Sequence, residues 1–105
     1  MKGLINNVEI SYKAFLPTIK EVETIMISKL GYDLQMLGVK SNTRGYVYPR
    51  MIFSYICRKK GVTLEVIGKA IHRDHSTISG YLRNFESYYK SDKVFKILVD
   101  VIINA

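Results

Sequence analysis

The stretch TLEVIGKAIHRDHSTISGYLRNFESYYK, residues 63–90, contains two helical patterns joined by a short polar connection. The apolar residues of the first pattern share one helical face: Leu64, Ile67 and Ile71. The second pattern, capped by Asp74 or Ser76, carries an apolar stripe: Ile78, Leu82, Phe85 and Tyr89. Gly68 has no side chain and would let the two helices approach closely. The stretch therefore predicts a helix-turn-helix.

The rest of the chain carries further helical patterns, bounded by capping and breaking residues. Thr18 and Glu21 have the spacing of a capping box directly after Pro17. Pro49 suits the first turn of another helix. The expected parts are an N-terminal arm, 1–16; a helix, 18–30; a short turn from Asp33; a basic loop, 38–48; a helix, 49–60; the helix-turn-helix, 63–90; and a C-terminal helix, 91–105. We expect one compact all-α domain, 1–105, of about six helices.

The positive charge is concentrated in one part of the chain. The whole sequence carries a formal charge of +7, and residues 40–90 hold ten basic against three acidic groups, which accounts for all of it. A basic surplus confined to part of a small domain is typical of a nucleic-acid-binding protein. Anionic membranes and acidic proteins are the alternative partners for such a surface.

A family resemblance rests on residues 49–85, PRMIFSYICRKKGVTLEVIGKAIHRDHSTISGYLRNF. This stretch resembles the C-terminal DNA-binding domain of the bacterial replication initiator DnaA, whose signature is Ile-Gly followed by Arg-Asp-His-Ser/Thr-Thr and a helix. The resemblance extends more weakly over 17–90. It implies an all-helical domain that binds double-stranded DNA at a DnaA-box-like site, in replication control or transcription regulation.

The resemblance also implies roles for individual residues. The segment Asp74–Thr77 would read the box in the major groove, with His75 and Thr77 offering hydrogen bonds and apolar contacts to thymine methyls. An arginine from the basic loop would enter the adjacent minor groove, and Arg44 is our choice for it. Arg50, in the Pro-Arg of the pattern, would contact a base edge or a phosphate. The DNA-binding residues expected are Lys40, Arg44, Arg50, Lys60, Arg73, Asp74, His75, Ser76, Thr77 and Arg83.

Other functions have weaker support in the sequence. His72 and His75 lack the further ligands of a metal site, and adjacent Asp, His and Ser residues do not form a catalytic triad. The Gly61–Lys69 stretch has the wrong spacing for a phosphate-binding loop, and no ATPase fits in the chain. We expect neither an enzyme nor a cofactor. The competing function is a protein-interaction adaptor that keeps the fold without specific DNA binding.

The single cysteine and the C-terminal helix give two further expectations. Cys57 has no partner for an intrachain disulfide, and no signal peptide or membrane span is visible, so we expect a cytoplasmic protein. Residues 91–105 are apolar around almost the whole helix. Such a helix needs cover, which predicts either packing against the N-terminal arm or a homodimer interface.

Overall fold

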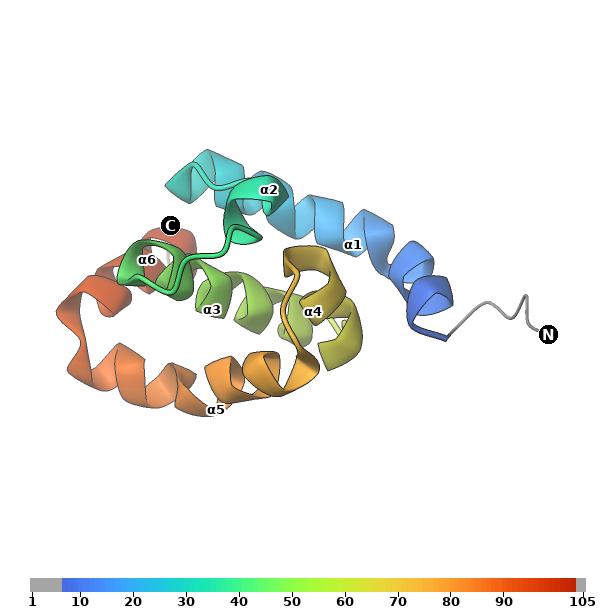
Figure 1. The fold of residues 1–105 in the computed structure, drawn as a ribbon. Helices are drawn as coiled ribbons and strands as arrows, with labels where there is room; N and C mark the ends of the chain where they lie inside the picture. The colour runs from blue at the N-terminus through green and yellow to red at the C-terminus, as the bar shows by residue number, and fades with distance from the viewer. Residues whose placement is uncertain (1–6, 104–105) are drawn as a thin grey trace.

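The computed structural model describes residues 7–103, which form six helices and no strand (Figure 1). The helices are α1 (Asn7–Leu30), α2 (Leu34–Leu37), α3 (Arg44–Lys59), α4 (Leu64–Ile71), α5 (His75–Ser91) and α6 (Lys93–Ile103). Helix α3 lies at the centre and packs against the other five. Helices α4 and α5 form the expected helix-turn-helix. The all-α fold class is therefore confirmed.

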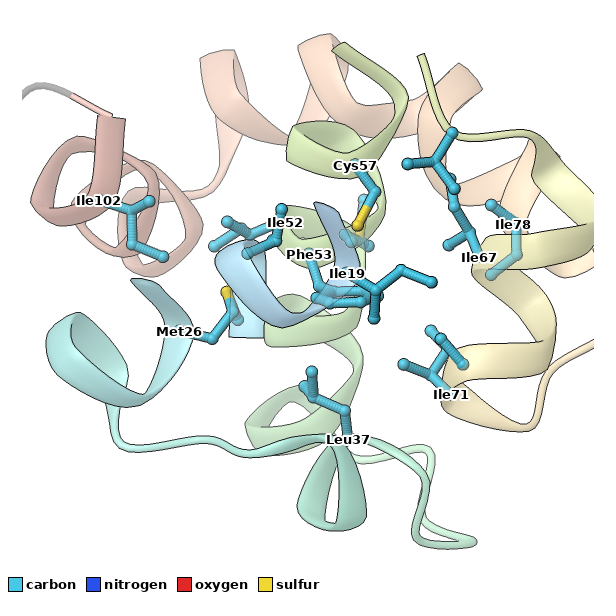
Figure 2. Close-up of a cluster of buried hydrophobic side chains, with 14 of the residues drawn as sticks. Ile19, Met26, Leu37, Ile52, Phe53, Cys57, Ile67, Ile71, Ile78 and Ile102 are labelled. Atoms are coloured by element: carbon cyan, nitrogen blue, oxygen red, sulfur yellow. The ribbon is translucent and has the colours of Figure 1, made fainter. Parts of the chain in front are cut away.

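One apolar core holds the helices together. Figure 2 shows aliphatic side chains from α1, α3, α4 and α5 converging on Phe53 of α3. A second, aromatic layer joins α3, α5 and α6: Phe85 stacks on Tyr55 at 4.0 Å between ring centroids and meets Phe95 edge-on at 5.1 Å. Ring pairs in these arrangements add to the stabilisation from burial. The core therefore fixes α5 against the rest of the domain along its length.

Helix α1 begins earlier than expected. It starts at Asn7 and continues through Pro17, so Thr18 is not a cap, and residues 7–16 of the expected arm are helical. Residues 1–6 lie outside the described part of the chain. Proline cannot donate a helical hydrogen bond, but Pro17 is exposed, and water can satisfy the carbonyl left free. Tyr12 packs against the core near α4, with the Lys69 ammonium 5.6 Å from its ring.

Helix α3 also begins earlier than expected, at Arg44, and it includes Pro49. The loop is therefore shortened from 38–48 to 38–43. Pro49 would normally leave the Gly45 carbonyl without a donor, because an interior proline removes the bond to the residue four before it. The Tyr32 hydroxyl donates to that carbonyl at 2.5 Å, which explains how the helix passes the proline.

Helix α6 is covered on one face only. Its start is capped by Asp92, whose Oδ1 accepts from the Phe95 amide at 3.0 Å. One face is buried in the core: Phe95, Val99 and Ile102. The opposite face is exposed: Val94, Ile97 and Val101. The N-terminal part of α1 projects away from α6 (Figure 1), so the expectation that the arm covers this helix is wrong for residues 7–16.

Candidate nucleic-acid interface

The turn between α4 and α5 depends on Gly68. His72 ends α4 in the left-handed conformation, at φ 57° and ψ 46°, and the Arg73 amide donates to the Gly68 carbonyl at 2.8 Å. A Cβ atom on Gly68 would lie well within 3.0 Å of the Arg73 carbonyl oxygen. The sequence predicted that Gly68 would let the two helices approach closely, but the close neighbour is the turn and not the facing helix. This contact sets the angle at which α5 leaves α4.

The first turn of α5 presents polar side chains to solvent. His75 and Asp74 are 59% and 69% exposed, and Ser76 is exposed beside them. Asp74 occupies the N-cap position but makes no side-chain cap bond. Instead its carboxylate accepts from Ser76 Oγ at 2.7 Å and lies 3.2 Å from His75 Nδ1. The Ser76 bond and the neighbouring His75 lower the pKa of Asp74, so its carboxylate is charged at neutral pH.

A polar groove runs between this end of α5 and the shortened basic loop. Its lining comes from three segments, the loop, the α4–α5 turn and α5: Lys40, Asn42, Arg73, Thr77 and Tyr81. The groove is open to solvent and has a volume of about 360 Å³. Two cations, a threonine hydroxyl and an amide in one open groove match the contacts that proteins make to phosphates and base edges.

The position of Arg50 differs from the sequence prediction that this residue contacts a base edge or a phosphate. Its side chain is fully buried beneath the loop and does not reach the surface. Its guanidinium donates to the carbonyls of Leu37 at 2.6 Å and Ser41 at 2.6 Å, and to that of Val39. Burial and the nearby Arg73 charge lower the pKa of Arg50. A buried guanidinium with these partners is not free to contact DNA, so the expected base-edge or phosphate contact is wrong for this structure.

Arg73 is partly engaged in the same way. Its Nη2 donates to the Val39 carbonyl at 2.6 Å, and its Nη1 donates to the His72 carbonyl at 2.9 Å. The side chain is nevertheless half-buried and lines the groove. Arg73 therefore links the α4–α5 turn to the loop by hydrogen bonds, and its guanidinium also contributes positive charge to the groove wall.

The remaining expected residues lie outside the groove. Arg44 is 70% exposed at the start of α3, 3.9 Å from the Asp92 carboxylate and beside Tyr48. Lys60 lies at the far end of α3 and forms an ion pair with Glu21 at 3.6 Å. Arg83 is exposed on α5, where its guanidinium lies over Gly80. The structure thus brings Lys40, Arg73 and Thr77 together in the groove, whereas Arg44 and Lys60 do not line it.

Two groove residues were missed by sequence reasoning. Tyr81 lies four residues after Thr77, so helical periodicity places both on one face, but Tyr81 is not among the DNA-binding residues that the sequence predicts. Asn42 had no sequence signal, because its position depends on how the loop is held against α3 and the turn.

Comparisons with known proteins agree with the fold. Residues 19–84 match the family described as bacterial dnaA protein helix-turn-helix, a DNA-binding module and not a catalytic one. The chain is 38% identical over 65 residues to the chromosomal replication initiator protein DnaA of Lachnoclostridium phytofermentans, covering 60% of this chain and 14% of that protein. It is 28% identical over 88 residues to DnaA of Mycoplasma capricolum, covering 82% of this chain and 20% of that protein.

The chain thus spans a fifth or less of the length of these curated relatives. No solved structure matches it. Within residues 7–103, no helix is both long enough and apolar enough to cross a membrane. The family match covers more than half of the chain and includes α3, the loop, α4, the α4–α5 turn and α5 as far as Asn84. The chain therefore belongs to the bacterial DnaA helix-turn-helix family.

Proposed function

We propose that this protein binds double-stranded DNA sequence-specifically at a DnaA-box-like site, in replication control or transcription regulation. One observation carries the proposal: the loop and the first turns of α5 share one polar groove, beside the exposed Asp74–Ser76 segment. A helix-turn-helix inserts the start of its second helix into the major groove, while flanking cations contact phosphates. Both relatives are chromosomal replication initiator proteins, which supports a role at replication sites.

The proposed roles follow exposure and chemistry. His75, Ser76 and Thr77 contact base edges from the start of α5, and Asp74 orients His75 and Ser76 through its two carboxylate oxygens. Lys40, Arg73 and Arg83 contact phosphates. Arg44 enters a flanking minor groove after its ion pair with Asp92 breaks. Lys60 makes at most a peripheral phosphate contact, because it lies near α1 and the end of α6.

Binding to duplex DNA at several salt concentrations tests the proposal. A DnaA-box duplex and a scrambled duplex of equal composition should both lose affinity as salt rises, since counterion release drives phosphate binding. The box duplex should keep an advantage of at least about a thousandfold, the usual margin of specific over non-specific binding. Equal, weak binding to both duplexes would favour the adaptor alternative. Selection from random duplexes would then define any preferred site.

The exposed face of α6 supports a second proposal, self-association. Val94, Ile97 and Val101 lie at helical spacing on one face, and Ile97 is 62% exposed. We propose a homodimer in which the exposed α6 faces of two copies pack together. We also propose that the protein is cytoplasmic, where its single cysteine stays reduced. Ile102 is unsuited to testing this contact because it is buried in the core. The exposed Ile97 is the appropriate position.

A further inference from the structure

The loop that forms one wall of the groove has little secondary structure of its own. Among its residues, 38–43, a short backbone bond joins the Ser41 amide to the Val39 carbonyl at 3.0 Å, and Ser41 and Thr43 pair through their hydroxyls. Such a segment would sample many conformations if nothing else held it. Yet Lys40 and Asn42 must stay beside Thr77 for the groove to exist.

One buried side chain supplies most of the additional restraint. Arg50 uses three of its nitrogens on three alternate carbonyls of the chain, those of Leu37, Val39 and Ser41. The guanidinium is planar and rigid, so three bonds in fixed directions define the path of the backbone around it. The loop is therefore wrapped around a group that belongs to α3.

The same guanidinium is connected to both halves of the helix-turn-helix. Its Val39 partner also accepts from Arg73 of the α4–α5 turn, at 2.6 Å. Burial lowers the pKa of Arg50 most strongly, the Arg73 charge lowers it further, and the nearby Tyr81 of α5 opposes both effects. Tyr81 and Arg73 both line the groove. Arg50 thus lies where the loop, the turn and α5 meet.

From this geometry we infer that Arg50 is a positioning residue: without touching DNA, it holds the 38–43 loop so that Lys40 and Asn42 face the same groove as Thr77. The inference rests on the proposed DNA binding for its effect, but not for its structural part. A loop ordered in advance loses less conformational freedom when it binds, which increases affinity. Placement of the loop, and not an added charge at the interface, is the contribution of this arginine.

The central variant is Arg50→Lys, which keeps the positive charge but loses the planar donor set. Arg58→Lys is the matched control, because Arg58 also donates to a loop carbonyl, that of Val62 at 3.1 Å, away from the groove. In the absence of DNA, the backbone order parameters of residues 39–43 should fall from about 0.85 to about 0.6 in Arg50→Lys. They should stay unchanged in Arg58→Lys. Unchanged loop order in Arg50→Lys would overturn the inference, whether or not the protein binds DNA.

A double-mutant cycle with Lys40→Ala tests the functional half. In the wild-type background, Lys40→Ala should reduce the salt dependence of duplex binding by about one ion. In the Arg50→Lys background it should change neither affinity nor salt dependence, because Lys40 is no longer held at the groove. A simple loss of stability would leave the Lys40 effect intact, so equal Lys40→Ala effects in both backgrounds would overturn the inference.

A measurement on the wild-type protein tests the inference even if the Arg50 variant fails to fold. The Arg50 Nε–H resonance should be protected from solvent exchange and should not shift when box duplex is added, whereas that of exposed Arg83 should shift. A DNA-induced shift of Arg50 as large as that of Arg83 would show direct contact and overturn the positioning role. Failure of the wild-type protein to bind any duplex would remove the proposed function, while the exchange protection and the loop order would still decide the structural inference.

Discussion

The polar groove and the outer face of α6 are two surfaces built in opposite ways. The groove takes its side chains from the loop, the α4–α5 turn and α5, and hydrogen bonds from the buried Arg50 hold the loop in place. The α6 face comes from a single helix, and Val94, Ile97 and Val101 lie on it because of helical spacing alone. A site assembled from several segments depends on every contact that positions them, whereas a one-helix stripe survives most changes elsewhere.

The largest expected effect comes from breaking the turn that positions the groove. Gly68→Ala would force a Cβ into the Arg73 carbonyl, which is backbone and cannot move away cheaply. We expect a loss of about 1–3 kcal/mol or more in the free energy of unfolding, the usual range for overpacking.

Gly80→Ala on α5 is the control, because its Cβ would meet only the Arg83 side chain, at 3.8 Å. It should stabilise the helix by roughly 0.5–1 kcal/mol. Urea unfolding measures both, and equal effects would contradict this role of Gly68.

The next effect concerns affinity and not stability. His75→Ala and Thr77→Ala should each weaken binding to the preferred duplex by about 1–3 kcal/mol, and much less to random duplex, because base contacts specify while phosphate contacts position. Ser87→Ala, at an exposed position farther along α5, should change neither. Fluorescence anisotropy titrations on both duplexes give the comparison. Equal losses on the two duplexes would remove the base-reading role from these residues.

The α6 face should respond in oligomeric state alone. Ile97→Glu places a charge on the proposed contact, so a dimer at micromolar concentration should become a monomer, while unfolding stability changes by less than about 0.5 kcal/mol because the side chain is exposed. Ile10→Glu changes another exposed isoleucine, on α1, and should leave the dimer intact. Sedimentation equilibrium separates the outcomes. A wild-type protein that is monomeric throughout rejects the dimer, and a dimer that survives Ile97→Glu places the contact elsewhere.

The smallest expected effect is a pH dependence of stability that arises from Asp92, the residue that precedes α6 and bonds to Tyr48 of α3. Asp92 accepts from the Tyr48 hydroxyl at 2.6 Å and from the Phe95 amide, and these bonds lower its pKa. A carboxyl whose pKa is lower in the folded state stabilises the protein above its ordinary pKa of 3.8, and that stability is lost as pH falls through the lowered value. Thermal unfolding from pH 7 to acid should show this decrease.

The Tyr48–Asp92 bond also raises the pKa of Tyr48, so its stabilisation should be lost as pH rises above the ordinary tyrosine value of 10.0. Tyr48→Phe removes the bond that is the main cause of both shifts, and it should flatten the acid and the alkaline decreases together. If Tyr48→Phe keeps the wild-type pH profile, the pH dependence arises from other groups.

The sequence by itself determined the helix-turn-helix, the polar Asp74–Ser76 segment at the start of its second helix and the apolar character of α6. These features depend on local spacing, because helical periodicity and capping act over a few residues. The same local reasoning missed the starts of α1 and α3. At Pro49 a distant partner decided the outcome: the Tyr32 hydroxyl satisfies the carbonyl that the proline leaves free.

Only the tertiary structure decided which charged residues face the groove. Arg44 and Arg50 are six residues apart and equally plausible in the sequence, yet one is exposed beside Asp92 and the other is buried under three carbonyls. Burial of a cation becomes favourable only when several acceptors surround it, and here they come from Leu37, Val39 and Ser41, brought to α3 by the path of the chain. Asn42 and Tyr81 enter the groove for the same reason: their neighbours are set by packing between segments, which no local pattern records.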